Sequence, residues 1–313
     1  MTQELQLKQQ SNSNTSSFLG LFSLLFGVFV LSFAAIFTRL SENELGPIAT
    51  AFNRFTIATI ALFSWELIQS SFISKSANNT SPKITLKDWG TIGVLAFFGM
   101  INIVSWAWSL THTSIANSNL LHNTTPIFTT LGAWLFLGYR FDKIFILGMI
   151  LALTGAIAIG LKDFTIKTDY LIGDSVAFMS AIFYGINYLI REKLRSKFST
   201  QTILQWFCLF SSLLTLPLAL IFEKQIFPIS WQVWTAVICL GILCQIIGHG
   251  LLTEALKTFS SGFVSLFMLL EPLITALFAW LIFAEKLTYL NWISFFIVLG
   301  GIYLAKLGQG TQK

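Results

Sequence analysis

Residues 126–137 read PIFTTLGAWLFL, and residues 272–283 read PLITALFAWLIF. The two stretches are 146 positions apart, and the match extends without a gap over residues 110–155 and 256–301, with eleven identities in 46 positions. The shared residues include a proline, Pro126 on Pro272, and a tryptophan, Trp134 on Trp280, which are too rare for apolar composition alone to align. The chain is therefore predicted to contain an internal duplication.

The composition indicates that a lipid bilayer surrounds both copies. The 313 residues are 55% hydrophobic and only 11% charged, whereas charged residues make up about a quarter of soluble proteins. A soluble core of this length cannot hide so much apolar area, and the 31 Phe and 10 Trp suit a lipid-facing surface with aromatic anchors. The predicted fold class is an all-α membrane protein.

Charges and turn residues divide the chain into ten apolar segments. A hydrocarbon core of roughly 30 Å needs about 20 helical residues, and each segment is close to that length. The apolar run at 18–40 is too long for a signal peptide, so it is interpreted as the first span. Residues 1–17 and 307–313 are predicted to be tails, the first of them disordered. The predicted spans are 18–40, 46–69, 89–111, 115–138, 143–161, 171–190, 201–222, 231–253, 261–284 and 288–306.

Lysine and arginine are unequally distributed between the two sides of the predicted membrane. With the N-terminus inside, thirteen lie in cytoplasmic segments and five in the opposite ones, and only Arg54 lies within a span. Short basic loops remain in the cytoplasm. Both tails are therefore predicted to be cytoplasmic, in a bacterial inner (plasma) membrane. The net charge of +5 forms no patch, so nucleic acid is not expected as a partner.

The duplication predicts an inverted repeat. Each half, 18–162 and 171–306, contains five predicted spans, and because five is odd the second half enters the membrane from the opposite side. Secondary transporters commonly have this architecture, with a site near the bilayer midplane that is exposed to one side and then to the other. The sequence therefore predicts ten transmembrane helices in two inverted five-helix repeats, and alternating access to a small-molecule substrate.

Several short motifs resemble those of EamA-type permeases in the drug/metabolite transporter superfamily. The second half carries Leu270-Glu271-Pro272, Ala279-Trp280-Leu281, Glu285-Lys286-Leu287-Thr288 and Gly300-Gly301, and the first half carries Asn53-Arg54-Phe55, Pro126, Ala133-Trp134 and Gly155. The resemblance covers residues 18 to 306 and implies ten spans in two five-helix halves. It also implies export or exchange of amino acids, metabolites or drugs. The first half departs from the pattern, because Tyr139 stands where the second half has Glu285.

Polar residues inside the predicted spans are candidates for a substrate cavity, because a polar group that faces hydrocarbon costs several kcal/mol. The fourth span places five polar or helix-bending residues on one helical stripe. The alternative is that these residues hydrogen-bond between helices. The stripe consists of Asn119, His122, Asn123, Pro126 and Thr130. Other spans add further candidates for substrate binding: Asn102, Ser105, Trp106, Tyr184, Asn187, Gln245 and His249.

Two charged residues within spans are candidates for coupling or gating. Glu271 lies near the middle of the ninth span, where a carboxylate is normally protonated or hydrogen-bonded, and it is the best candidate for proton coupling. Pro272 leaves a carbonyl without its helical partner, so a bend or a gate there is an equal alternative, as at Pro126. Arg54 either snorkels toward the interface or caps a neighbouring helix, which is the favoured interpretation, or it attracts an anionic group.

A small-residue face follows the fifth span, with Gly148, Ala152, Ala156 and Gly160 four residues apart. Such a face allows another helix to approach closely, either within the chain as a scaffold or in a homodimer.

Other function classes fit the sequence less well. An intramembrane enzyme would need a catalytic motif, and the chain has neither His-Glu-x-x-His nor Gly-x-Ser-x-Gly. A membrane receptor or scaffold would need a larger partner-binding domain than these loops allow. No catalytic residue, metal or cofactor is predicted. The favoured function is export of a small neutral or zwitterionic metabolite or drug, with weakly cationic solutes also open. Organic phosphates would need several cationic groups, and Arg54 is the only permanently charged group in a span.

Overall fold

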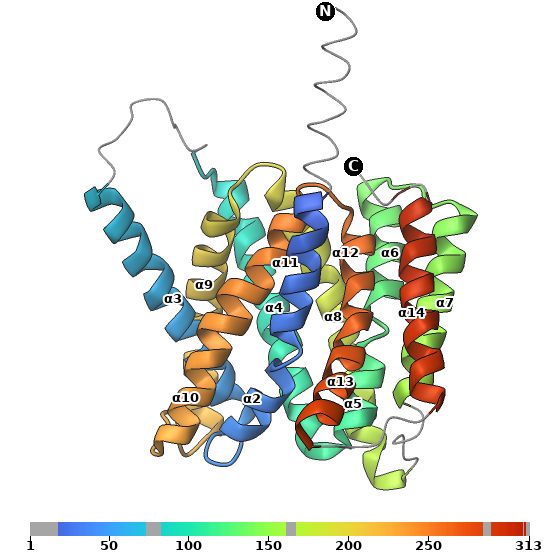
Figure 1. Cartoon of the computed structure of the whole chain (residues 1–313). Coiled ribbons are helices and arrows are strands. Elements are labelled where there is room, and N and C mark those ends of the chain that lie inside the picture. The colour runs from blue at the N-terminus through green and yellow to red at the C-terminus, as the bar shows by residue number, and fades with distance from the viewer. Residues whose placement is uncertain (1–17, 73–82, 161–166, 284–288, 309, 311–313) are drawn as a thin grey trace, which may run out of the picture.

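The computed structural model describes residues 18–72, 83–160, 167–283, 289–308 and 310. Within these ranges the secondary structure is helical apart from turns, short irregular segments and one isolated bridge residue. The helices lie side by side with their long axes roughly aligned (Figure 1). The expected N-terminal tail, residues 309 and 311–313 of the expected C-terminal tail, and Glu285 lie outside the described residues.

The first half consists of helices from residue 18 to Gly160. A helix over 18–31 is followed, after a two-residue turn, by α2. The later elements of this half are α2 (Ala34–Ser41), α3 (Pro47–Phe72), α4 (Leu86–His112), α5 (Ile115–His122), α6 (Thr125–Leu137) and α7 (Lys143–Gly160).

The second half follows a similar order. A short 3₁₀ turn, η1 (Thr168–Tyr170), precedes it, and a π-helical segment, η2, lies in the middle of its third crossing. Its elements are α8 (Leu171–Arg195), α9 (Thr200–Phe222), α10 (Trp231–Cys239), η2 (Leu240–Gly248), α11 (His249–Ala255), α12 (Ser261–Phe267), η3 (Met268–Leu270), α13 (Glu271–Phe283) and α14 (Tyr289–Leu307).

Six helical segments of the described chain are long and apolar enough to cross a membrane. They are Phe18–Ser41, Leu86–His112, Lys143–Gly160, Thr200–Phe222, Trp231–Ala255 and Tyr289–Leu307. The helices α3 and α8 have comparable lengths, 26 and 25 residues, but contain the buried arginines Arg54 and Arg191. The protein is a multi-pass membrane protein.

Hydroxyl side chains begin many of the helices. A residue at the helix N-cap accepts a hydrogen bond from a backbone N–H of the first turn that has no partner within the helix. This contact recurs at Thr85, Ser114, Ser199, Ser230 and Ser260, which precede α4, α5, α9, α10 and α12. These residues fix where the chain leaves a turn and enters a helix.

Both helices that carry the repeated proline are broken next to it. The expected span 115–138 is divided into α5 and α6, and the expected span 261–284 into α12, η3 and α13. Pro126 and Pro272 each take the second position of the following helix, where their missing N–H removes no helical hydrogen bond. Both predicted spans are therefore interrupted where the prolines already suggested a bend, and the breaks fall at matching positions of the two halves.

The small-residue face of α7 packs against α14 of the same chain. A Cβ atom on Gly301 would lie 2.7 Å from the carbonyl oxygen of Gly148, and one on Gly148 would lie 2.6 Å from the carbonyl oxygen of Gly301. Ala152 contacts the same part of α14. The close approach that the sequence predicts thus lies inside the chain, as a scaffold contact between the last helices of the two halves.

Two glutamates fasten the loops at one end of the bundle. Glu223 accepts hydrogen bonds from the backbone N–H groups of Ile48 and Ala49, at 2.7 and 2.8 Å, where α3 begins. Glu44 does the same at the start of α10, where Ile229 donates at 2.8 Å. Hydrogen bonds from Ser230 and Ile229 hold the pKa of Glu44 below its usual value. The loops of the two halves are therefore tied to each other at this end.

Candidate functional site

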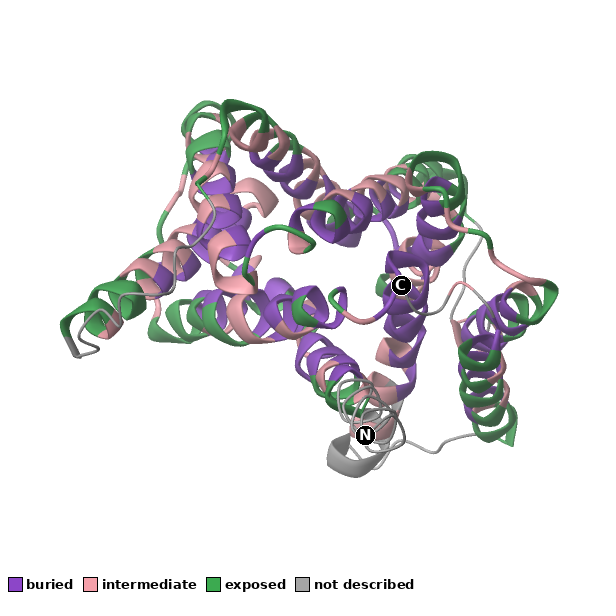
Figure 2. Ribbon diagram, turned by 90° about the horizontal axis from the view of Figure 1, so that it is seen from above, coloured by how far each residue is buried: buried purple, intermediate pink, exposed green. Residues whose placement is uncertain are grey.

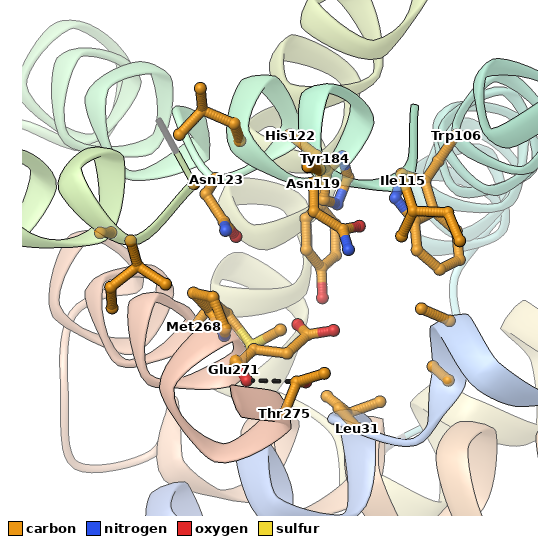
Figure 3. Close-up of a pocket in the computed structure, with 18 of the residues that line it drawn as sticks. Leu31, Trp106, Ile115, Asn119, His122, Asn123, Tyr184, Met268, Glu271 and Thr275 are labelled. Atoms are coloured by element: carbon orange, nitrogen blue, oxygen red, sulfur yellow. Dashed lines mark hydrogen bonds between the residues drawn. The ribbon is translucent and has the colours of Figure 1, made fainter. Parts of the chain in front are cut away.

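A cavity of about 480 Å³ lies inside the bundle. Its wall is formed by both halves of the chain, including the breaks after α5 and before α13 (Figure 3). Seen along the bundle, the buried residues face inward and the exposed ones outward (Figure 2). A cavity of this size can enclose a small organic molecule.

Most of the predicted site residues line this cavity. They come from six helical crossings, distributed over both halves of the sequence, and the structure brings them together. The predicted residues that line it are Arg54, Asn102, Trp106, Asn119, His122, Asn123, Tyr184, His249, Glu271 and Pro272.

Four predicted residues do not line the cavity. Asn187 is buried and donates a hydrogen bond to the carbonyl oxygen of Leu95, at 3.3 Å. Gln245 is buried beside the cavity, and its side-chain oxygen accepts a hydrogen bond from Nε of Arg54. Pro126 is buried in the first turn of α6, and Ser105 lies on another part of α4. These four belong to the packing of the helices around the site.

The break after α5 explains why the predicted stripe divides. Asn119, His122 and Asn123 precede the break and face the cavity. Thr130 follows it on α6, is buried away from the cavity, and donates to the sulfur of Met149 at 3.4 Å. A continuous helix would have kept all of these residues on one line. Because the helix is broken, Thr130 packs against Met149 instead of facing the cavity.

An aromatic wall forms one side of the cavity. The ring of His122 stacks on that of Tyr184, with centroids 5.1 Å apart, and the ring of Trp106 lies 5.9 Å from His122. The Nδ1 atom of His122 is 2.8 Å from the hydroxyl of Ser180. The hydroxyl of Tyr188 donates to that of Tyr184, at 3.0 Å. These contacts fix the rings in orientations that can stack on a ligand.

Arg54 lies deep inside the bundle. Arg54 is only 3% exposed to solvent. Its Nε donates a hydrogen bond to Oε1 of Gln245 in the π-helical segment η2, at 3.0 Å. It also lines the cavity. A snorkelling arginine would extend its guanidinium to the wet interface, so the snorkelling half of the favoured interpretation is wrong, and Arg54 contacts another helix through Gln245.

Arg191 is a second buried arginine. It was counted among the thirteen cytoplasmic charges, because the predicted span ends at residue 190. The helix α8 instead continues to Arg195, and Arg191 is 3% exposed. It donates to the hydroxyl of Thr253, at 3.1 Å, and lies over the ring of Phe207. Its position seven residues after Tyr184 puts it on the same helical face, which is the signal that would have revealed it.

Glu271 is the first residue of α13, and its carboxylate points into the cavity, toward the side on which the hydroxyl of Tyr184 projects (Figure 3). The backbone carbonyl oxygen of Glu271 accepts a hydrogen bond from Thr275, at 3.0 Å. Thr275 also lines the cavity, as do Met268 and Asn291. Sequence reasoning missed these three, although the match of Thr275 to Thr129 in the repeat was a signal for the first.

The end of the bundle at which α6 ends and α12 begins is held together by polar contacts. The hydroxyl of Tyr139 donates to Glu192 Oε1, at 2.7 Å, and Oε2 of Glu192 accepts from the backbone N–H of Ser261, at 2.9 Å. Burial, and then the hydrogen bond to Glu192, raises the pKa of Tyr139, so its hydroxyl stays protonated as a donor. Phe259 and Phe263 are fully buried next to these contacts. The cavity wall continues instead toward the opposite end, where Ile115 begins α5.

The chemistry of the cavity is that of a binding site. It offers amide, imidazole and phenol groups for hydrogen bonds, an aromatic wall for stacking, one guanidinium and one carboxylate. Within the part of the chain that the structure describes, no group of three His, Cys, Asp or Glu residues could hold a metal ion.

A multi-pass helical membrane protein with a polar cavity between its two halves has the form of a membrane transporter. The sequence pattern of the EamA-like transporter family matches residues 18–161 and again residues 171–307. The chain belongs to this family, as its motifs suggested.

Known relatives agree with this assignment. An uncharacterized transporter of Archaeoglobus fulgidus is 25% identical over 281 residues, which cover 88% of this chain and 92% of that protein. The pseudopaline exporter CntI of Pseudomonas aeruginosa is 24% identical over 193 residues, 61% of this chain and 66% of the exporter. A solved crystal structure superposes with a TM-score of 0.75 at 18% identity, covering 94% of this chain and 98% of that one, so the two share a fold.

Proposed function

We propose that the protein is a secondary transporter that exports a small neutral or zwitterionic metabolite, such as an amino acid, or a drug across the inner membrane by alternating access. The observation that carries the proposal is the cavity of about 480 Å³, lined by both apolar and polar side chains, to which both halves of the chain contribute. A cavity enclosed by two halves can open to either side when the halves rock against each other.

The proposed architecture is ten transmembrane helices in two inverted five-helix repeats, residues 18–162 and 171–306, with both tails in the cytoplasm. Three observations support it. The family pattern matches the chain twice, the helices break at matching positions before Pro126 and Pro272, and helix 18–31 begins at the same end of the bundle at which α14 finishes (Figure 1).

Alternating access is supported by the difference between the two ends of the cavity. The contacts of Glu192 with Tyr139 and Ser261 hold three helices together at one end, whereas the lining extends toward the other end. With cytoplasmic tails, the closed end is the cytoplasmic one. The arrangement then corresponds to an outward-facing state, and export requires the Tyr139–Glu192 contact to open.

A double substitution tests the cavity. His122→Ala combined with Asn123→Ala removes a stacking ring and two hydrogen-bonding groups from the wall. The expected result is a loss of transport by about tenfold or more, because one hydrogen bond and one ring contact are each worth roughly 1 kcal/mol. The measurement is uptake of amino acids and other metabolites into proteoliposomes that contain the purified protein.

The matched control is Ser105→Ala on α4, a predicted site residue that does not line the cavity. It should leave uptake close to that of the unmodified protein. If the double variant transports the same solutes at the same rates and with the same preference, the cavity is not the transport site.

A further inference from the structure

Two groups of opposite charge line the cavity without pairing with each other. Within the described ranges the ion pairs closer than 4.0 Å are Arg39–Glu42, Arg195–Glu254 and Lys197–Asp88, all distinct from Arg54 and Glu271. A buried charge is costly unless it is paired and hydrogen-bonded. The charges of Arg54 and Glu271 therefore have a larger effect on what enters the cavity than the neutral groups around them.

Gln245 leaves the terminal nitrogens of Arg54 as the donors for a ligand. Its oxygen accepts from Nε, which is the hydrogen bond that Arg54 forms with the described residues. The guanidinium has five N–H donors in a planar fork, four of them on the terminal nitrogens. Such a fork matches the two oxygens of a carboxylate, with two parallel charge-assisted hydrogen bonds. Gln245 is a positioning residue in this arrangement, because it sets the rotation of the fork.

Glu271 provides the complementary charge at the break before α13. Its carboxylate projects into the same cavity, with the hydroxyl of Tyr184 extending toward it (Figure 3). An ammonium group has three donors and no acceptor, so a carboxylate and a phenol oxygen suit it. The rings of Trp106 and His122 and the side chains of Leu31 and Met268 leave an apolar surface for the rest of the molecule.

The charges also decide against the two simpler classes of ligand. An organic cation bound at Glu271 would share the cavity with an uncompensated guanidinium. An organic anion bound at Arg54 would leave the carboxylate of Glu271 without a cationic partner, so Glu271 would have to take up a proton. A zwitterion compensates both charges, and the cavity with its ligand is then neutral overall, which low-dielectric surroundings favour.

We propose that Arg54 is the specificity-determining residue that binds a carboxylate of the substrate, while Glu271 receives its ammonium group, so that the cavity selects zwitterions. This inference rests on the proposed function, since it concerns the same cavity. The proposed function allows neutral solutes, zwitterions and drugs as substrates. The inference restricts the substrates to molecules that carry both a carboxylate and an ammonium group.

The test uses three probes with the same isobutyl side chain. L-leucine carries both charges, L-leucinamide only the ammonium, and 4-methylpentanoate only the carboxylate. Binding to the full-length protein in detergent is measured by the shift of the thermal unfolding midpoint with probe concentration, and transport by counterflow in proteoliposomes. The unmodified protein should bind L-leucine about tenfold or more tightly than either analogue, since a polar site rejects a ligand that leaves its groups unpaired.

Arg54→Gln should remove the preference for L-leucine over L-leucinamide, and it should raise the affinity for L-leucinamide, because the cation then no longer shares the cavity with an uncompensated guanidinium. Arg54→Lys should retain part of the preference, because it keeps the charge but not the fork. The matched control is Arg191→Gln, which removes a buried arginine that does not line the cavity. That variant should unfold at a lower temperature and keep the preference.

Three outcomes overturn the inference: none of the probes binds, L-leucine and L-leucinamide bind the unmodified protein equally, or folded Arg54→Gln keeps the preference. Equal counterflow of L-leucine and L-leucinamide would overturn the inference and leave the proposed transport intact. Charge-selective binding without any counterflow would overturn the transport function and leave the role of Arg54 intact.

Discussion

The Glu271→Gln variant is expected to lose gradient-driven accumulation of substrate and to keep only a weakened exchange of substrate across the membrane, because the amide oxygen can still accept from the ammonium group but carries no charge. Glutamine keeps the size of the side chain but cannot take up and release a proton. Without a group that exchanges a proton for substrate, a carrier only equilibrates its solute, so the accumulation ratio should fall to about 1. The measurement is uptake into proteoliposomes with and without a pH gradient.

The same measurement separates the two roles that the sequence left open for this position. If Glu271 acts only in a gate beside Pro272, the substitution changes the rates with and without the gradient by the same factor. Pro272→Ala, at the neighbouring residue, is the matched variant, because it alters the bend and leaves the carboxylate in place. Full accumulation by Glu271→Gln would show that another group couples transport to protons.

The second large effect is expected from Gly301→Leu on α14. A Cβ atom there would lie 2.7 Å from the carbonyl oxygen of Gly148 and would also contact the backbone of Ala152. Backbone atoms cannot move aside as a flexible side chain can, so α7 and α14 must separate. We expect a loss of stability of about 3 kcal/mol or more, or no folded protein.

The neighbouring glycine provides the control, since a Cβ on Gly300 has no atom within 4 Å. Gly300→Leu on the lipid-facing side should therefore leave stability close to that of the unmodified protein. Thermal unfolding in detergent and the yield of monodisperse protein compare the two variants. Equal stability of Gly300→Leu and Gly301→Leu would contradict the packing of α7 on α14.

Composition and helical periodicity predicted the class of fold, and most of the residues predicted for the site line the cavity. Asn119 and His122 are three residues apart, and Gln245 and His249 four, so each pair shares one helical face whatever the neighbouring helices do. Lipid cannot solvate such groups, and they face inward for that reason. The sequence could therefore indicate which side chains face the interior.

The sequence could not show which of these residues reach the cavity. The stripe of the fourth span was predicted on a continuous helix, and the break before Pro126 separates Asn119 and His122 from Thr130. Gln245 was predicted to contact substrate, but it contacts Arg54, a residue 191 positions away. Contacts of that kind depend on which helices become neighbours, and the periodicity of one helix does not contain that information.

For the same reason, the sequence did not predict that the two arginines Arg54 and Arg191 are buried. Charge counting treats an arginine near the end of a span as wetted, because most are. Arg191 is buried because α8 continues past the predicted end and turns that face toward Thr253 and Phe207. Arg54 is buried because Gln245 of another helix accepts its Nε–H. A partner on another helix decided both cases.

The most direct test of alternating access is the reactivity of a single cysteine at Asn119 in a chain whose Cys208, Cys239 and Cys244 are replaced by alanine. Asn119 lies on the cavity wall. A membrane-impermeant maleimide is applied to one face or the other of sealed vesicles with the protein in a known orientation. If the cavity opens to each side in turn, the maleimide should modify Asn119→Cys from both faces, and the ratio should shift when transported solute is present on one side. Modification from one face only, unchanged by solute, would contradict it.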